Sequence, residues 1–204
     1  MHGLMMADQL RVAGILEHAA KWHADTEIVS RLPEGGIHRY TYAAAHRRSK
    51  QLANALLRLG IENGDRVATL AWNTHRHFEL YYGVAGIGAV CHTINPRLFP
   101  EQLVYIINHA EDRLLFFDLT FLPLVERLAP VCPKVEKWVL LAPAAHLPAA
   151  SLTWAGGHQG TAGAGPAATT GLGLADWAAA TDPASSRTAP ARAVIDRNMC
   201  QPSR

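Results

Sequence analysis

Apolar positions recur with two different periods along the first two thirds of the chain. They return every three or four positions, as in amphipathic helices, within residues 9–22, 42–59, 75–88, 100–107 and 119–129. Short runs rich in β-branched and aromatic residues occupy 66–71, 89–93, 114–117 and 137–141. Strands that alternate with helices indicate βαβ units, so we expect an α/β fold with a largely parallel sheet.

Local signals mark the ends of several of these elements. Residues 26–32 and 38–41 flank the turn sequence Pro-Glu-Gly-Gly and predict a β-hairpin. Thr41 suits the N-cap of the helix that follows, and Gly60 suits the left-handed position just beyond its end. Pro100 is expected in the first turn of its helix.

The composition changes at Pro143. Residues 143–204 consist mainly of Ala, Gly, Thr, Pro and Ser, and they contain no Phe, Tyr or Lys. Such a segment cannot bury enough apolar surface to offset its ordering entropy. We therefore expect one folded unit over residues 1–142 and a low-complexity, disordered tail over 143–204.

Net charge and cysteine content limit the cellular compartment and the classes of partner to be expected. The formal net charge of +2 favours neither nucleic acid nor an anionic membrane. Three cysteines without a Cys-x-x-Cys pair indicate neither a disulfide framework nor a zinc site, so a reducing cytoplasm is expected. The most apolar run, 78–90, includes Glu79 and is too short to span a bilayer.

Most candidate chemical motifs have a simpler structural interpretation. We expect the histidines, including His75, His77 and His92, to be surface or capping residues instead of metal ligands. The glycines of 83–88 have the wrong spacing for a dinucleotide fingerprint and indicate close helix packing. The Gly-rich run 156–173 lacks the lysine of a phosphate loop, and Arg47-Arg48 is expected on a solvated helix face.

The best polar candidate is the segment 93–97, Thr-Ile-Asn-Pro-Arg, because it follows a strand where α/β proteins place ligand loops. Asn95 and Arg97 are the candidate substrate-binding residues. The alternative is a loop fixed by hydrogen bonds from the Asn95 side chain to nearby backbone, with Arg97 in a surface ion pair. No catalytic constellation can be assigned from sequence order.

A dense series of short motifs also runs through residues 8–142. They occupy 40–42, 51–56, 59–61, 64–67 (Gly-Asp-Arg-Val), 71–77 (Ala-Trp-Asn-Thr-His-Arg-His), 79–81, 88–90, 92–98 and 105–112. This series resembles the N-terminal part of fatty acyl-CoA synthetases, in the adenylate-forming superfamily. The resemblance covers about two thirds of the chain and implies part of that superfamily's N-terminal domain.

The resemblance implies an activity for the full-length family. Its members use ATP and Mg²⁺ to convert a fatty acid to an acyl-adenylate, which the thiol of coenzyme A then attacks. The family's phosphate loop ending Pro-Lys-Gly, its Thr-Glu motif, its ribose-binding Asp and its C-terminal Lys are all missing from these 204 residues. We therefore expect no cofactor site on this chain and no activity from it alone.

Two hypotheses follow from the change at residue 143. The genetic code permits residues 194–203, read one base forward, to become Ser-Thr-Glu-Thr-Cys-Ala-Ser-Leu, which resembles the family's approach to its phosphate loop. This would place a frameshift between 143 and 194. Alternatively, the chain is a non-catalytic module that binds itself or a partner through sheet edges and apolar helix faces.

Overall fold

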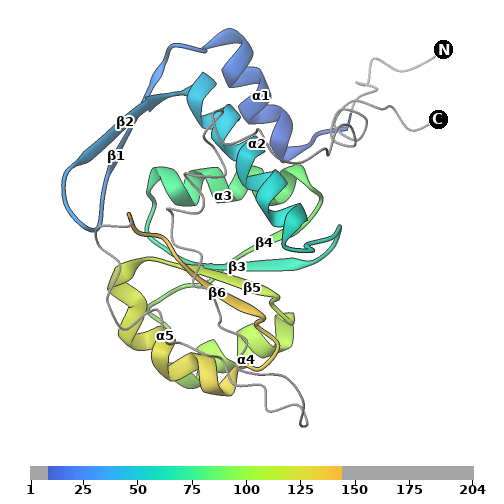
Figure 1. Ribbon diagram of the computed structural model, residues 1–204, viewed down its shortest axis with the longest axis vertical. Helices are drawn as coiled ribbons and strands as arrows, with labels where there is room; N and C mark the ends of the chain where they lie inside the picture. The colour runs from blue at the N-terminus through green and yellow to red at the C-terminus, as the bar shows by residue number, and fades with distance from the viewer. Residues whose placement is uncertain (1–8, 144–204) are drawn as a thin grey trace, which may run out of the picture.

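The computed structural model describes residues 9–143 and arranges them in three layers, with helices on both faces of a sheet (Figure 1). The helices are α1 Val12–Trp22, α2 Tyr42–Arg58, α3 His75–Gly86, α4 Pro100–Ala110 and α5 Leu122–Leu128. The strands are β1 Glu27–Arg31, β2 Ile37–Thr41, β3 Arg66–Leu70, β4 Val90–Thr93, β5 Leu114–Phe117 and β6 Lys137–Leu140. The predicted α/β fold is confirmed, and the predicted tail lies outside the described residues after Pro143.

The central sheet has the strand order β4-β3-β5-β6, and all its pairs are parallel. β1 and β2 form the predicted hairpin as a separate antiparallel pair. In Figure 1, α1, α2 and α3 lie on one side of the sheet, and α4 and α5 lie on the other. The chain leaves β3 toward one face and β4 and β5 toward the other, an arrangement that opens ligand crevices at carboxyl strand ends in α/β folds.

Strand alternation divides the core in two. In β3 and β5, Val67 and Leu114 pack toward α2 and α3, whereas their neighbours Ala68 and Leu115 pack toward α4 and α5. Side chains of a strand alternate between its two faces, so a strand buried on both sides reads as a continuous apolar run. This explains why the strand signal was strong in the sequence.

The glycines of the helical layer have two distinct roles. A Cβ on Gly83 would lie 2.8 Å from Leu52 Cδ2 and 3.1 Å from the Ser49 carbonyl oxygen, which confirms close packing of α3 on α2. Gly88, however, lies beyond the end of α3 with φ of +77°, so its assignment to helix packing was wrong. Gly60 adopts the predicted left-handed conformation after α2, with φ of +82°.

Helix boundaries follow the local signals in most places. The Thr41 side chain accepts a hydrogen bond from Ala44 N at 3.3 Å, as expected of an N-cap. The helix predicted over 119–129 is instead divided into the 3₁₀ turn Leu119–Phe121, α5 and the 3₁₀ turn Ala129–Val131. Pro123 and Pro130 lie at the starts of α5 and the second 3₁₀ turn, where their missing N–H groups cost nothing.

Within residues 9–143, no helix has the length and apolar character needed to cross a membrane.

Candidate functional site at the carboxyl edge of the sheet

Buried polar side chains gather where β3, β5 and β6 end, beside the β1–β2 hairpin. The first turn of α3 contributes Thr74, His75, Arg76 and His77, all at most 5% exposed. Asp118 follows β5 directly and is fully buried. Buried polar groups are costly unless they are paired. The hydrogen bonds and ion pairs of this cluster therefore show which of its polar side chains already have a partner within the fold.

Arg76 joins three segments at this edge. Its guanidinium forms an ion pair with Glu34 of the hairpin turn, and both side chains are almost fully buried. The same group donates to the Leu141 carbonyl oxygen, just after β6, at 3.2 Å. Arg76 therefore fastens the hairpin and the last strand to the start of α3, and its charge is compensated within the fold.

Two histidines of α3 are buried, so their assignment as surface or capping residues was wrong. The His75 backbone N–H donates to Ser30 Oγ at 2.9 Å, and its ring stacks on His38 with centroids 3.8 Å apart. His77 Nε2 lies 3.0 Å from Thr69 Oγ1. Burial lowers the pKa of both rings. The pKa of His75 falls to about 3, since His38 and the nearby arginines add to the effect, whereas a backbone hydrogen bond with Trp72 opposes the shift at His77. Both rings are therefore neutral at pH 7.

Asp118 is the site residue that the sequence did not reveal. Its Oδ2 accepts a hydrogen bond from Trp72 N at 2.6 Å, whereas its Oδ1 has no partner among residues 9–143. Burial raises the pKa of the carboxyl group to about 6, against the opposing hydrogen bond from Trp72. The Trp72 ring lies beside Phe121, with centroids 5.1 Å apart. A polar residue directly after a fully buried strand was the available signal.

A second buried acid, Glu79, lies one turn further along α3, four residues after His75. Arg48 Nε donates to Glu79 Oε1 at 2.6 Å, and the Glu79 side chain is 3% exposed. Burial raises the Glu79 pKa, while Arg48 opposes that shift. Arg47 is exposed, but Arg48 is not on a solvated face, so that part of the prediction was wrong.

The predicted candidates Asn95 and Arg97 lie at the same edge of the sheet, after β4, and both are exposed. Asn95 Oδ1 accepts a hydrogen bond from Arg97 N at 3.0 Å, which is the backbone-fixing contact of the alternative interpretation. The surface ion pair expected for Arg97 is absent among residues 9–143. The loop is thus ordered by Asn95 and presents the guanidinium to the surroundings.

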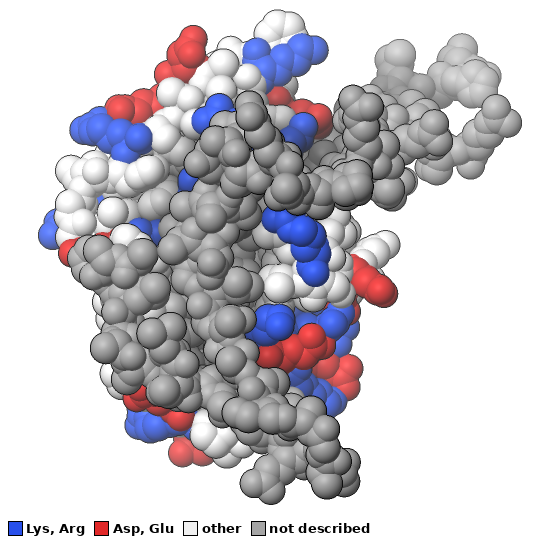
Figure 2. Space-filling view, viewed as in Figure 1, with Lys and Arg blue, Asp and Glu red and all other residues white. Residues whose placement is uncertain are grey.

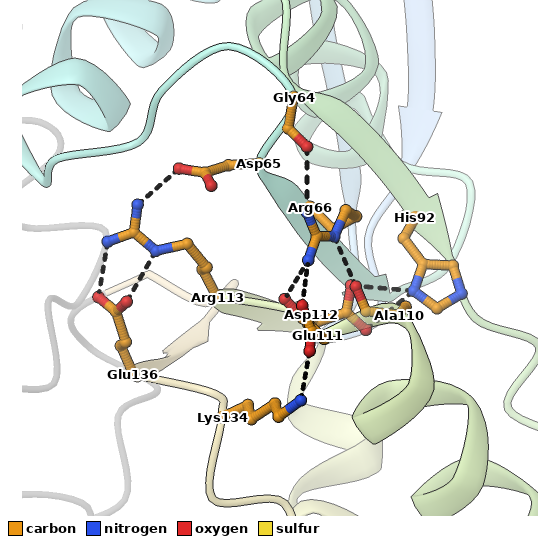
Figure 3. A network of polar contacts seen from close by, with 10 residues as sticks. All are labelled: Gly64, Asp65, Arg66, His92, Ala110, Glu111, Asp112, Arg113, Lys134 and Glu136. Carbon is orange, nitrogen blue, oxygen red and sulfur yellow. Dashed lines mark hydrogen bonds and ion pairs between the residues drawn. The ribbon is translucent and has the colours of Figure 1, made fainter.

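The opposite, amino edge of the sheet holds a network of ion pairs (Figure 3). Arg113 bridges Asp65 and Glu136, with contacts of 2.5 and 2.7 Å. Arg66 donates to the Ala110 carbonyl oxygen at 2.5 Å and contacts Glu111. Asp65 and Arg66 belong to the Gly-Asp-Arg-Val motif, so this motif ties the starts of the strands together.

His92 belongs to the same edge and has a carboxylate partner, Asp112. Its Nδ1 lies 2.8 Å from Asp112 Oδ2, and Asp112 is fully buried. The hydrogen bond to Asp112 raises the His92 pKa, although partial burial opposes it. The pair joins β4 to the start of β5. Among residues 9–143, no group of three or more His, Cys, Asp or Glu side chains is placed to hold a metal ion.

The described residues do not fit a complete nucleotide site. At the carboxyl edge the buried cation of Arg76 is already compensated by Glu34, and an ionised Asp118 would repel a phosphate. On the described part of the face in Figure 2, Lys and Arg side chains lie beside Asp and Glu, without a large area of one sign. No step of an ATP-dependent reaction can therefore be assigned to these side chains.

Comparison with known proteins identifies the family to which the chain belongs. The profile of the AMP-binding enzymes matches residues 16–189. The 3-methylmercaptopropionyl-CoA ligase of Ruegeria pomeroyi is 52% identical over 143 residues, which cover 70% of this chain and 26% of that protein. The medium-chain-fatty-acid–CoA ligase of Ectopseudomonas oleovorans is 47% identical over 142 residues, again 70% and 26% of the two chains.

A solved structure shares the fold. The fatty acyl CoA synthetase of Mycobacterium tuberculosis superposes with a TM-score of 0.55 at 25% sequence identity. The superposition covers 64% of this chain and 26% of that one. The chain spans about a quarter of the length of the curated relatives it matches. Because the family profile matches well over half of the residues, the chain belongs to the AMP-binding enzyme family, whose fold its α/β layers share.

Proposed function

We propose that this chain is the N-terminal part of a fatty acid–CoA ligase of the cytoplasm. The complete enzyme would use ATP, Mg²⁺ and coenzyme A, with an acyl-adenylate as intermediate. The observation that supports this most is the 47% identity to a medium-chain-fatty-acid–CoA ligase across 142 residues. The motifs that resemble the family lie at both edges of the sheet, with residues 64–67 at the amino edge and 71–77 at the carboxyl edge.

The role proposed for residues 9–142 is that of a scaffold. Arg76 and Asp118 hold the loops after β3, β5 and β6 in one arrangement, so that the carboxyl edge is rigid before any substrate arrives. The phosphate-binding and ribose-binding motifs would come from sequence outside this stretch. The 204 residues alone are therefore expected to be inactive, and ATP–pyrophosphate exchange by the purified chain would contradict that expectation.

The acid that the complete enzyme activates is open between two chemical types. The relatives are named for a medium-chain fatty acid and for the short thioether acid 3-methylmercaptopropionate. We favour a fatty acid, because the runs Trp-Asn-Thr-His-Arg-His at 72–77 and Asn-Pro-Arg-Leu at 95–98 resemble the medium- to long-chain branch of the family. A comparison of kcat/KM for octanoate and 3-methylmercaptopropionate in an active enzyme containing this segment would decide between them.

Asn95 and Arg97 are the proposed substrate contacts within the described residues. Arg97 is exposed at the carboxyl edge, and a guanidinium can hold a carboxylate or phosphate in two hydrogen bonds. In an active enzyme containing this segment, Arg97→Met should raise the KM for ATP or the acid. An unchanged KM for every substrate would show that Arg97 does not contact a substrate.

Self-association is the second candidate function, and one feature of α1 favours it. Val12, Ile15 and Trp22 are between 52% and 64% exposed and lie at helical spacing along one side of α1. Exposed apolar stripes of this kind mark interaction surfaces. Sedimentation at micromolar concentration would test it: a dimer that dissociates on Ile15→Glu supports association through α1, and a monomer at all concentrations rules it out.

A further inference from the structure

A cavity of about 330 Å³ lies among α1, α2 and α3. It reaches the last turn of α3, whereas the carboxyl-edge site begins at the first turn of the same helix. Its volume falls at the lower end of the range for small-molecule sites, roughly 300–1,000 Å³. None of the contacts described at the carboxyl edge involves its lining.

Small side chains create the space. Beside the larger Val12, Leu16 and Tyr82, the lining contains many small residues, among them Ala53, Ala85, Gly86, Gly88 and Ala89. A Cβ built on Gly14, which also lines the cavity, would meet no atom within 4 Å. The interior can therefore accept an apolar body without displacing the surrounding helices.

The exposed part of the cavity lining is positively biased. Its charged side chains are Arg11 and Lys50, against the single carboxylate of Glu17. The N-terminus of α1 is also part of the lining; it has no side-chain cap and no acidic residue in its first turn. Its free N–H groups and the positive end of the helix dipole favour an anion there.

Ser49 provides an independent indication of a missing ligand. It lines the cavity from α2 and is only 4% exposed, yet its hydroxyl has no hydrogen-bond partner among residues 9–143. An unpaired buried hydroxyl is unfavourable, so a ligand oxygen that reached it would be stabilised. Burial and the charge of Lys50 lower the pKa of His46 beside it, which leaves that ring neutral.

We propose that this cavity binds a short single-chain amphipathic anion. The carboxylate or phosphate head lies at the N-terminus of α1 between Arg11 and Lys50, within reach of the Ser49 hydroxyl. The alkyl body lies over Ala53 and Ala85. This site is separate from the proposed ligase function, and no reaction occurs in it.

Isothermal titration of the full 204-residue chain tests the proposal with octanoate, octyl phosphate and octanol as probes. One saturable site is expected for at least one of the two anions, with octanol at least tenfold weaker, since it lacks the charge-assisted hydrogen bonds. The two anions together show whether a carboxylate or a phosphate is preferred. Failure of both anions to bind at millimolar concentration, or equal binding of octanol, would overturn the proposal.

Three variants locate the site. Lys50→Met and Ser49→Ala should each weaken binding several-fold, and Ser49→Ala removes a hydroxyl that the free protein leaves unpaired. Gly14→Leu should fill the cavity and abolish binding without lowering Tm, because it replaces a helical glycine where there is open space. Circular dichroism confirms that each variant is folded.

Two matched controls separate this site from others. Arg47→Met removes an exposed charge from α2 outside the lining, and Arg97→Met removes the proposed substrate contact at the carboxyl edge. Both should leave the affinity unchanged. If Arg97→Met abolishes octanoate binding while Gly14→Leu does not, the anion binds at the proposed ligase site and the cavity is not a binding site.

Discussion

Arg48 on α2 and Glu79 on α3 form an ion pair of 2.6 Å across 31 residues of sequence. Glu79 is nearly inaccessible to solvent, while the Arg48 side chain retains 26% of its exposure. The pair lies between the two helices that cover one face of the sheet. Its arginine was expected on a solvated face, so the pair is also the clearest case of a tertiary contact that overrides a local pattern.

Arg48→Met should destabilise the fold by about 3 kcal/mol, because it leaves the buried Glu79 carboxylate without its ion-pair partner. This loss of unfolding free energy should become smaller as the pH falls. Loss of Arg48 raises the Glu79 pKa further, and the protonated acid costs less to bury. Urea unfolding at several pH values measures both effects.

The adjacent arginine provides the control for that substitution. Arg47→Met should change stability by no more than about 0.5 kcal/mol, as expected for an exposed site. Adding Glu79→Gln to Arg48→Met should recover part of the loss. Equal effects of Arg47→Met and Arg48→Met would contradict the importance assigned to the buried pair.

Glycine substitutions test the packing of the helical layer. Gly83→Ala should cost about 1–3 kcal/mol, because the new Cβ would lie 2.8 Å from Leu52 Cδ2 in a close-packed interface. Gly14→Ala should instead stabilise by about 0.5–1 kcal/mol, since α1 offers the methyl group open space. Thermal unfolding compares the two, and a neutral Gly83→Ala would show that α2 and α3 are not in contact there.

The His92–Asp112 pair predicts a specific pH dependence. The His92 pKa is raised in the folded state, so its contribution is fully present below the ordinary histidine pKa of about 6.5. It is lost as the pH rises through the folded value. The stability difference between the wild type and His92→Gln should therefore be largest at pH 6 and decline toward alkaline pH. A pH-independent difference would mean that the pair is not charge-assisted.

His75 should give stability the opposite dependence on pH. Its folded pKa is lowered to about 3, so the unfolded chain takes up a proton below about pH 6.5 and the folded chain does not. Stability should therefore fall as the pH decreases from 6.5 toward 3. His75→Phe keeps a ring against His38 and removes this titration, so its acid-induced loss should be smaller. An unchanged pH profile of unfolding would place His75 in solvent.

Sequence patterns predicted the elements because their signals are local. The period of Leu52 and Leu56, the cap at Thr41 and the left-handed Gly60 each depend on a few neighbouring residues. The contacts that define the site are not local. Trp72 and Asp118 are 46 residues apart, and only the order β4-β3-β5-β6 brings them together.

Two residues of these contacts can be recognised in the sequence by a weaker signal. Glu79 interrupts an apolar helix, and Asp118 immediately follows the buried strand β5, so both are polar residues where a buried position is expected. Such positions indicate a partner without identifying it. Asn95 and Arg97 became candidates because they follow a strand, and their contact with a substrate stays a prediction.

Acyl-CoA formation by a chimera tests the central claim most directly. Residues 9–142 of this chain would replace the matching segment of the medium-chain-fatty-acid–CoA ligase of Ectopseudomonas oleovorans, with the native enzyme and the isolated 204-residue chain assayed in parallel. The account predicts a folded chimera that converts octanoate and coenzyme A to octanoyl-CoA with ATP, while the isolated chain does not. A folded chimera without activity, or an active isolated chain, would contradict it.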